Sequence, residues 1–225
     1  MLWDTHMHCA FSGDSDADPE LMIQSAIEKQ LDGICFTDHL DYDYPEEPEL
    51  FLLDFPAYQG RIFSLKEKYK KVILVANLPY YITTQIIEKV LTECKIIDEI
   101  VVMVQKEVAL KYTSDYKSPL TFMIQDMGKI EYMFTVSQNV FIPAPHVDSA
   151  ILKITIDRPA DLNLYKVLNS AFKQKRKTIY NNLKNDYQDV LDVLNENQID
   201  QKLRCEQLTL EDYKALTKSF YKHTI

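Results

Sequence analysis

Short apolar runs alternate with helical patterns as far as about residue 157, and this alternation constrains the fold more than any other feature of the chain. From Leu164 onward the pattern is helical throughout. Strands that alternate with helices are typical of a parallel or mixed sheet covered by helices. We therefore expect an α/β domain followed by a small all-α domain.

The expected elements follow from apolar periodicity and from helix-starting residues. Strands are expected over 2–5, 34–36, 72–76, 100–105, 130–137 and 150–156. Helices are expected from Pro19 and over 57–69, 84–93, 107–111, 165–183, 187–195 and 210–221, with an acidic loop over 40–56. Thr209 and Asp212 have the spacing of a capping box at the start of the last helix.

Charge is distributed unevenly along the chain. The formal net charge is -9, with -10 in residues 1–70 and +1 in residues 71–225. Such a shift suggests segments with different partners. No apolar run approaches the roughly 20 residues that cross a bilayer, and the start of the chain lacks the pattern of a secretory signal. The four cysteines show no zinc or redox spacing. We expect a cytoplasmic protein whose cysteines stay reduced.

The first chemical motif lies at two strand ends near the N-terminus. Asp4 lies in the first expected strand, His6 and His8 directly follow that strand, Asp14 comes next, and His39 lies just after the second expected strand. Imidazole and carboxylate groups suit zinc, manganese or iron, which can activate water against a phosphate ester. The alternative is that these histidines cap strands and bind nothing.

Residues 1–70 resemble the start of a histidinol phosphatase of the polymerase-and-histidinol-phosphatase family. The matching stretches are 4–8, 11–15, 33–39 and 41–45. The resemblance implies a β/α fragment whose divalent metal ligands are His6, His8, Asp14 and His39. Only His146 and His223 follow residue 70, so the later ligands of that family have no counterpart and the implied metal site is incomplete.

The second motif, Asn77-Leu78-Pro79-Tyr80, directly follows an expected strand. An adenine amino group is a weak nucleophile because its lone pair is delocalised into the ring. An asparagine oxygen and the next carbonyl can accept hydrogen bonds from the two amino protons, and a tyrosine ring can stack on an extruded base. The alternative is a strand-ending turn fixed by proline.

Residues 71–225 resemble the ribosomal RNA adenine N6-dimethyltransferase family. The matching stretches are 75–84, 104–109, 141–150, 172–178, 181–183 and 208–213. The resemblance implies a Rossmann-like sheet, S-adenosylmethionine as cofactor, and ribosomal RNA or the small ribosomal subunit as partner. It also implies that Asn77, Leu78, Pro79 and Tyr80 hold the target adenine, that Asn77 adjoins the cofactor, and that Phe141 stacks on the other face of the base.

A basic run, Lys173-Gln174-Lys175-Arg176-Lys177, places four cations in five residues of an expected helix. A solvated face is the ordinary explanation of such a run. Next to the other motifs we expect these four cations to contact RNA phosphates, which position RNA without reading its sequence.

The glycines argue against a complete cofactor site. The chain has four, Gly13, Gly33, Gly60 and Gly128, and no Gly-x-Gly. Dinucleotide-type sites use a glycine-rich turn that lets the backbone approach the ligand closely.

The sequence thus predicts a partial Rossmann-like methyltransferase sheet completed by a β/α fragment of another enzyme. The expected domains are 1–70 (phosphatase-like), 71–158 (back half of the methyltransferase α/β domain) and 159–225 (helical RNA-recognition domain). The expected function is that of an rRNA adenine dimethyltransferase family member with impaired methyl transfer. The alternatives are a metal-dependent phosphoesterase and an inactive fusion product that only binds RNA.

Overall fold

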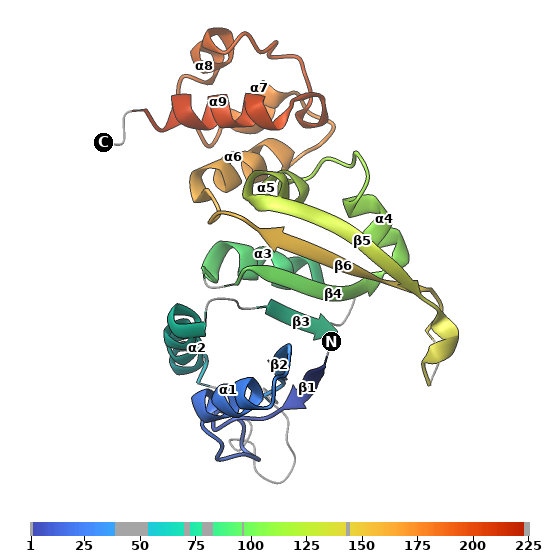
Figure 1. Cartoon of the computed structure of the whole chain (residues 1–225). Helices are drawn as coiled ribbons and strands as arrows, with labels where there is room; N and C mark the ends of the chain where they lie inside the picture. Colours follow the sequence, from blue (N-terminus) through green and yellow to red (C-terminus); the bar gives the residue numbers. More distant parts are fainter. Residues whose placement is uncertain are drawn as a thin grey trace. The chain divides into compact units, whose positions relative to one another are not determined.

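The computed structural model describes residues 2–38, 54–69, 73–77, 83–95, 97–142 and 145–222. The chain divides into two compact units, Met1–Val72 and Ile73–Ile225. Strands and helices are interleaved as far as β6, and only helices follow (Figure 1). The expected change from α/β to all-α is therefore confirmed. The expected three-domain division remains a prediction.

The first unit is built on a parallel strand pair. Strand β1 (Trp3–Met7) pairs with β2 (Gly33–Phe36), and α1 (Pro19–Glu28) connects them. Helix α1 begins where expected, because the Asp18 side chain accepts hydrogen bonds from the first free N–H groups and Pro19 occupies the first turn. Helix α2 (Phe55–Tyr69) follows. The expected loop over 40–56 lies mostly outside the described residues.

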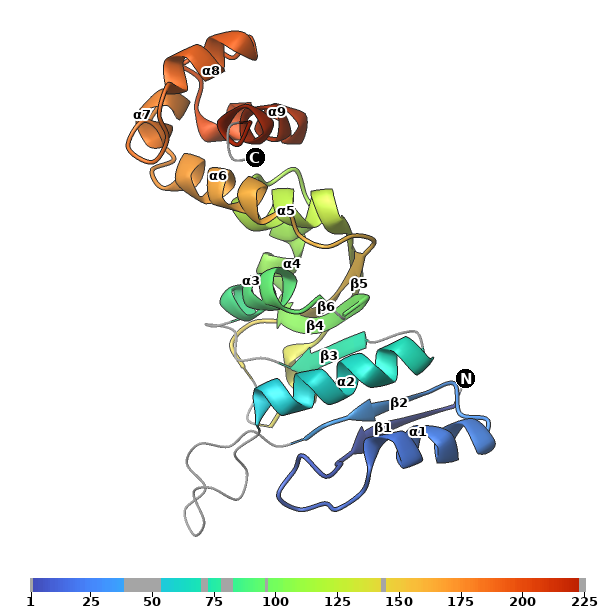
Figure 2. The same cartoon turned by 90° about the vertical axis from the view of Figure 1, so that its left-hand side faces the viewer.

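The second unit contains a four-stranded sheet in the order β3-β4-β6-β5. Strands β3 (Ile73–Asn77) and β4 (Glu99–Gln105) are parallel, and β6 (Ser149–Ile156) is antiparallel to both β4 and β5 (Gly128–Val136). Helices α3 (Thr83–Glu93), α4 (Lys106–Tyr112) and α5 (Pro119–Met127) cover one face of this sheet (Figure 2).

Burial along β4 and β6 explains this arrangement. Alternate residues of β4, such as Ile100 and Val102, are fully buried and pack with Leu152 and Ile154 of β6 against the three helices. The other face of the sheet is more open, and Val75 of β3 is 55% exposed. A half-covered sheet of this kind needs alternating apolar residues, which the sequence supplies.

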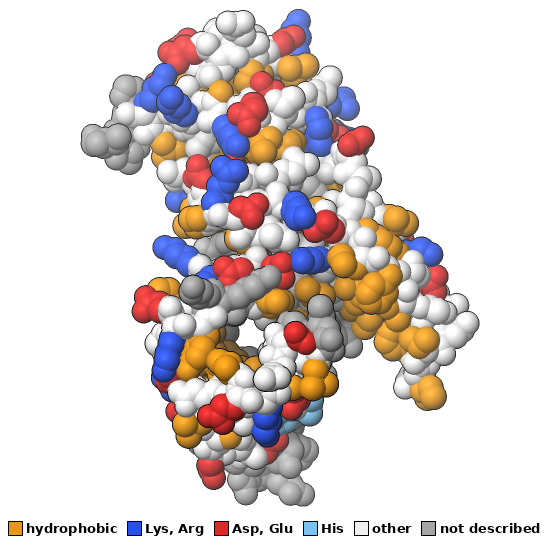
Figure 3. Space-filling view, in the orientation of Figure 1, with side chains coloured by type: hydrophobic (Ala, Val, Ile, Leu, Met, Phe, Trp, Pro, Cys, Tyr) orange, Lys and Arg blue, Asp and Glu red, His pale blue; other side chains and the backbone are white. Residues whose placement is uncertain are grey.

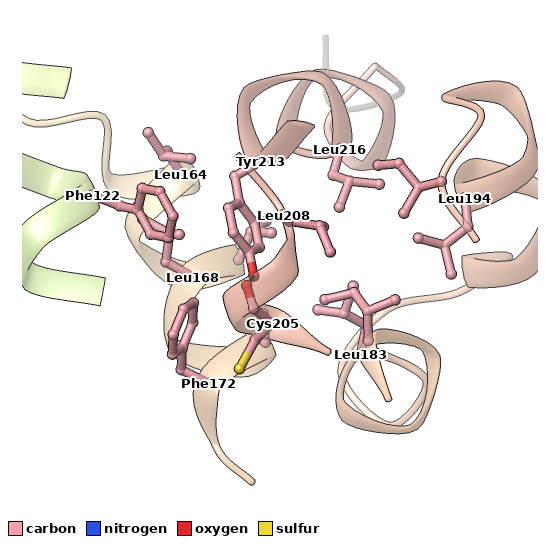
Figure 4. Packing of buried hydrophobic residues seen from close by; sticks show 14 of the residues in the cluster. Phe122, Leu164, Leu168, Phe172, Leu183, Leu194, Cys205, Leu208, Tyr213 and Leu216 are labelled. Atoms are coloured by element: carbon pink, nitrogen blue, oxygen red, sulfur yellow. Dashed lines mark hydrogen bonds between the residues drawn. The ribbon is translucent and has the colours of Figure 1, made fainter. Parts of the chain in front are cut away.

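The C-terminal part consists of four helices with their own core. They are α6 (Leu162–Phe172), α7 (Ile179–Leu183), α8 (Val190–Glu196) and α9 (Leu210–Phe220). The core packs around the fully buried Tyr213 and includes Phe122 of α5 (Figure 4). The capping box of Thr209 and Asp212 is confirmed.

Two structural expectations need correction. The described strands form two separate sheets, not one mixed sheet shared by residues 1–70 and 71–158. Within each unit one helix connects the two parallel strands, α1 between β1 and β2 and α3 between β3 and β4. The single helix expected over 165–183 is two helices separated by a turn. Among the described helices, none is both long and apolar enough to cross a membrane.

Candidate functional site

Asn77 is the last residue of β3 and pairs in register with Met103 of β4. It therefore lies at the carboxyl end of a parallel strand pair, where open α/β sheets bind their ligands. The other residues predicted to hold the adenine, Leu78, Pro79 and Tyr80, lie outside the described residues.

The loop that carries Phe141 extends from the same edge of the sheet. Phe141 is half-buried and follows a short 3-10 helix, Gln138–Val140, to which its N–H is hydrogen-bonded. The side chain of the next residue, Ile142, is fully exposed. Figure 3 shows a contiguous hydrophobic area here, over the ends of β5 and β6.

Asp148 ties this loop to the strand end. Its Oδ1 accepts a hydrogen bond from the N–H of Gln138 at 3.1 Å, and its Oδ2 lies 3.5 Å from Lys106 Nζ. Its carbonyl accepts a hydrogen bond from the Lys106 N–H at 3.0 Å. Lys106 begins α4 immediately after β4, so Asp148 fixes the Phe141 loop against the carboxyl end of β4. The sequence analysis gave Asp148 no role, although Asp148 lies within the stretch 141–150 that matches the dimethyltransferase family.

The basic run lies in the turn between α6 and α7. Helix α6 ends at Phe172, and Thr178 caps α7 by accepting a hydrogen bond from the Asn181 N–H at 3.3 Å. Neighbouring cations one turn apart disfavour a helix, and a threonine that caps the next helix competes with continued helix formation. These causes account for the break in the expected helix.

The four cations of this basic turn, residues 173–177, fall into two classes. Lys173 Nζ lies 2.5 Å from Asp186 Oδ2, and Lys175 Nζ lies 3.1 Å from Glu206 Oε1. Arg176 is exposed, as is Lys177, and within the described part of the chain neither has a carboxylate within 4.0 Å.

The pKa values of the paired groups agree with this division of the cations into two classes. The hydrogen bond from Lys173, followed by that from Ser170, lowers the pKa of Asp186 below its ordinary value. Burial would lower the pKa of Lys175, but hydrogen bonds to Tyr116 and Glu206 outweigh burial and raise it. Lys173 and Lys175 thus each have a carboxylate partner, whereas Arg176 and Lys177 have none among the described residues.

Two of the histidines expected to bind metal, His6 and His8, lie close together in the first unit. The ring centroids of His6 and His8 are 4.7 Å apart. Asp14 binds His8 Nδ1 at 2.7 Å and accepts a hydrogen bond from Ser12 at 2.6 Å, so its carboxylate is already engaged. His39 lies outside the described residues. Within the described ranges, no group of three or more histidine, cysteine, aspartate or glutamate side chains is arranged to hold a metal ion.

Asp38 has a structural role beside these histidines. It accepts hydrogen bonds from the Cys9 N–H at 2.7 Å and from Cys9 Sγ at 3.1 Å. Burial, with a smaller contribution from Asp38, raises the pKa of the Cys9 thiol to about 12. Cys9 is therefore an inert buried thiol at neutral pH. None of the four cysteines forms a disulfide in the structure.

Comparison with known families supports the second resemblance. The family model for ribosomal RNA adenine dimethylases matches residues 32–222. The chain belongs to the ribosomal RNA adenine dimethylase family. Members of this family are S-adenosylmethionine-dependent rRNA adenine dimethyltransferases. The match begins inside the segment that the sequence assigned to a phosphatase.

Relatives of this dimethylase-family chain are called ribosomal RNA small subunit methyltransferase A. The relative from Geobacillus sp. (strain WCH70) is 39% identical over 166 residues, covering 66% of this chain and 57% of the relative. The relative from Bacillus thuringiensis (strain Al Hakam) is 38% identical over 178 residues, covering 71% of this chain and 60% of the relative. The chain thus spans about 57–60% of the length of these relatives.

Solved structures show the fold of this family member. The 23S rRNA methyltransferase ErmE aligns with a TM-score of 0.53 at 19% identity, covering 97% of this chain and 91% of ErmE. A dimethyladenosine transferase from Plasmodium falciparum aligns with a TM-score of 0.58 at 19% identity, covering 99% and 91%. The fold is therefore an α/β methyltransferase fold with a helical C-terminal part.

Proposed function

We propose that this chain binds ribosomal RNA through its basic turn and receives a target adenine at the carboxyl edge of β3 and β4. The observation that carries the proposal is the pair Arg176 and Lys177, two exposed cations without a carboxylate partner in the described part of the chain. Unpaired cations on a turn that is held rigid by its neighbours suit phosphate contact.

The adenine site is proposed from the family resemblance and from the position of two elements. Asn77 and the Leu78 carbonyl would accept hydrogen bonds from the adenine amino group, with Pro79 fixing the turn. Tyr80 and Phe141 would stack on opposite faces of the base. The support is that β3 ends at Asn77 and that Asp148 anchors the Phe141 loop at the neighbouring strand end.

The residues of this chain do not fit S-adenosylmethionine well. Gly13 is the one glycine in a strand-to-helix connection, between β1 and α1, and no second glycine lies near it in sequence. Gly33 begins β2, Gly60 lies within α2, and Gly128 lies between α5 and β5. Within the described ranges, no glycine has the left-handed backbone that such turns use. We therefore propose weak or absent methyl transfer and derive no catalytic step through the cofactor.

Residues 1–70 are proposed to descend from a histidinol-phosphatase-like enzyme. The support is the Asp4-x-His6-x-His8 motif at the end of β1. Phosphoesterase activity is not favoured, because Asp14 is engaged by His8 and Ser12. Metal analysis of the purified chain tests this: stoichiometric zinc or manganese would restore the phosphoesterase alternative.

RNA binding is tested with the full chain and a fluorescent RNA hairpin that has unpaired adenines in its loop. The double variant Arg176→Gln/Lys177→Gln should weaken binding about tenfold and reduce the slope of log K against log salt by about one to two. The control Lys89→Gln/Lys95→Gln removes the same charge elsewhere and should change neither quantity. Equal effects of the two double variants would refute a specific role for the turn.

Cofactor binding is tested by calorimetric titration with S-adenosylmethionine. We expect no binding tighter than a Kd of about 100 μM, which corresponds to roughly 5.5 kcal/mol. Tighter binding would refute the proposed loss of methyl transfer and would leave the RNA-binding proposal intact.

A further inference from the structure

Two lysines from distant parts of the second unit converge on one tyrosine. Lys111 Nζ lies 4.2 Å and Lys175 Nζ 4.6 Å from the centroid of the Tyr116 ring. Lys175 Nζ also donates a hydrogen bond to Tyr116 Oη at 3.0 Å. Lys111 belongs to the last turn of α4, and Lys175 belongs to the basic turn. These three residues are called the two-lysine cluster below.

The two-lysine cluster carries more positive than negative charge. Glu206 neutralises Lys175 at 3.1 Å, but no carboxylate among the described residues lies within 4.0 Å of Lys111 Nζ. A third cation, Lys117, lies one residue after Tyr116 and donates to the Leu208 carbonyl at 3.0 Å. Like charges gathered on one ring repel each other, and an anion bound between them would relieve that repulsion.

The pKa of the Tyr116 hydroxyl shows that the electrostatic potential at this position is positive. Burial would raise the pKa of Tyr116, but hydrogen bonds from Lys175 and Lys111 and their charges outweigh burial and lower it. A cation–π contact of each ammonium group with the ring accounts for the two ring distances. It does not account for the hydrogen bond from Lys175 to the Tyr116 hydroxyl, which holds one ammonium group where it favours negative charge.

The chemistry of the anion follows from its neighbours. Arg176 and Lys177 follow Lys175 directly, so an anion at the two-lysine cluster lies beside the surface to which RNA binding is assigned above. A phosphodiester has two non-bridging oxygens, and one can accept from each ammonium group. A chain of such groups could contact the cluster and the two free cations together, which a single free anion could not do.

We propose that the two-lysine cluster binds one phosphodiester group of the RNA, shared between Lys111 and Lys175. Tyr116 acts as a positioning residue that keeps the two ammonium groups together. The inference rests on the proposed RNA-binding function and deepens it, because it adds Lys111, on a different element, to the interface.

The test is a salt titration of hairpin RNA binding by the full chain. Lys111→Gln should weaken binding three- to tenfold at low salt. The double variant Lys111→Gln/Lys175→Gln should reduce the slope of log K against log salt by about one, because both lysines serve one phosphate. A reduction by about two would show separate phosphates and overturn the shared site, and no reduction would overturn the site altogether.

Tyr116→Phe separates positioning from direct charge contact. It keeps the ring and both cations but removes the hydroxyl that Lys175 binds. We expect a two- to fivefold loss of affinity, and an unchanged affinity would overturn the positioning role. Thermal unfolding of each variant shows whether the fold is intact, and the exposed position of Lys111 means that Lys111→Gln should fold normally.

Two further comparisons show whether a negative result contradicts the two-lysine cluster alone or the proposed RNA binding as well. If Arg176→Gln/Lys177→Gln weakens RNA binding and Lys111→Gln does not, the inference fails and the proposed function survives. If neither variant matters, both fail. The Kd for hairpin RNA is also measured in phosphate buffer and in chloride buffer of equal ionic strength. We expect the two Kd values to be equal. A selective loss of the Lys111→Gln effect in phosphate would show a free-phosphate site and overturn the proposal.

Discussion

Asp126 of α5 and Lys214 of α9 form an ion pair at 2.9 Å in which the carboxylate side chain is only 9% exposed. The pair joins a helix that covers the sheet to the last helix of the C-terminal part. The hydrogen bond to Asp126 also raises the pKa of Lys214. The basic turn lies in the same C-terminal part, so this pair helps to fix the turn relative to the sheet edge.

Replacing Lys214 with methionine should destabilise the second unit by about 2 kcal/mol. The substitution keeps most of the side-chain volume but leaves a nearly buried carboxylate without its cation, which is costly. Urea unfolding measures the change. The control is Glu211→Gln, which removes the other, 81% exposed, partner of Lys214 and should cost less than about 0.5 kcal/mol. Equal effects would mean that burial of Asp126 contributes nothing.

Gly128→Ala should destabilise the second unit by about 3 kcal/mol or more. Gly128 ends α5 and begins β5, and an added Cβ would lie 2.0 Å from the Thr155 carbonyl oxygen of the neighbouring strand. Its backbone is extended, so the close approach of two strands, not backbone strain, requires glycine.

Gly60→Ala is the matched control. Gly60 lies in α2, and an added Cβ would meet nothing within 4 Å. Alanine should therefore stabilise that helix by up to about 1 kcal/mol. Calorimetry on each variant measures the change in stability, which should be negative for Gly128→Ala and positive for Gly60→Ala. A destabilised Gly60→Ala would refute the open environment assigned to this position.

Much of the fold follows from local pattern. The alternation of Ile100, Val102 and Val104 marks β4, and the Asp18-Pro19 pair marks the start of α1. Helix α5 was missed because seven of its nine residues are buried, so it has no amphipathic period. Its signal was Ser118 with Thr121, which form a capping box.

The site could be predicted only in part. Composition identified the cations of the basic turn, but it could not separate Arg176 and Lys177 from the two lysines that are paired. That division depends on Asp186 and Glu206, which lie 13 and 31 residues from their lysine partners in sequence and reach them only through tertiary packing. Lys111 was missed for the same reason.

Tyr213→Phe should destabilise the second unit by about 1 kcal/mol. The Tyr213 hydroxyl donates a hydrogen bond to the Cys205 carbonyl at 2.7 Å, and the side chain is fully buried (Figure 4). Phenylalanine keeps the ring contacts with Phe122 and Phe172 but leaves that carbonyl without its donor.

Chemical unfolding measures the loss caused by Tyr213→Phe, and Tyr213→Ala sets the scale. The larger truncation should cost about 3–5 kcal/mol because it also opens a cavity. If Tyr213→Phe were neutral, the hydroxyl would contribute nothing beyond the ring.

Asp186→Asn should cost about 1 kcal/mol at pH 7, and the cost should fall in acid. Asp186 accepts hydrogen bonds from Lys173 at 2.5 Å and from Ser170, and these lower its pKa below the ordinary value of 3.8. A lowered pKa means that the unfolded chain binds the proton more readily. The stabilisation is therefore complete above the unfolded pKa and is lost as pH falls through the folded one.

Urea unfolding of the wild type and Asp186→Asn at pH 7, 5 and 2 measures this dependence. The difference in unfolding free energy should be equal at pH 7 and 5 and should be smaller at pH 2, where the unfolded carboxyl is protonated and the folded one begins to be. Lys177→Gln is the control, since it removes a cation of the same turn that has no carboxylate partner among the described residues. Its effect on stability should be small at all three pH values. A difference for Asp186→Asn that is as large at pH 2 as at pH 7 would show that the carboxylate acts through packing instead of charge, and the hold on the basic turn would then need another source.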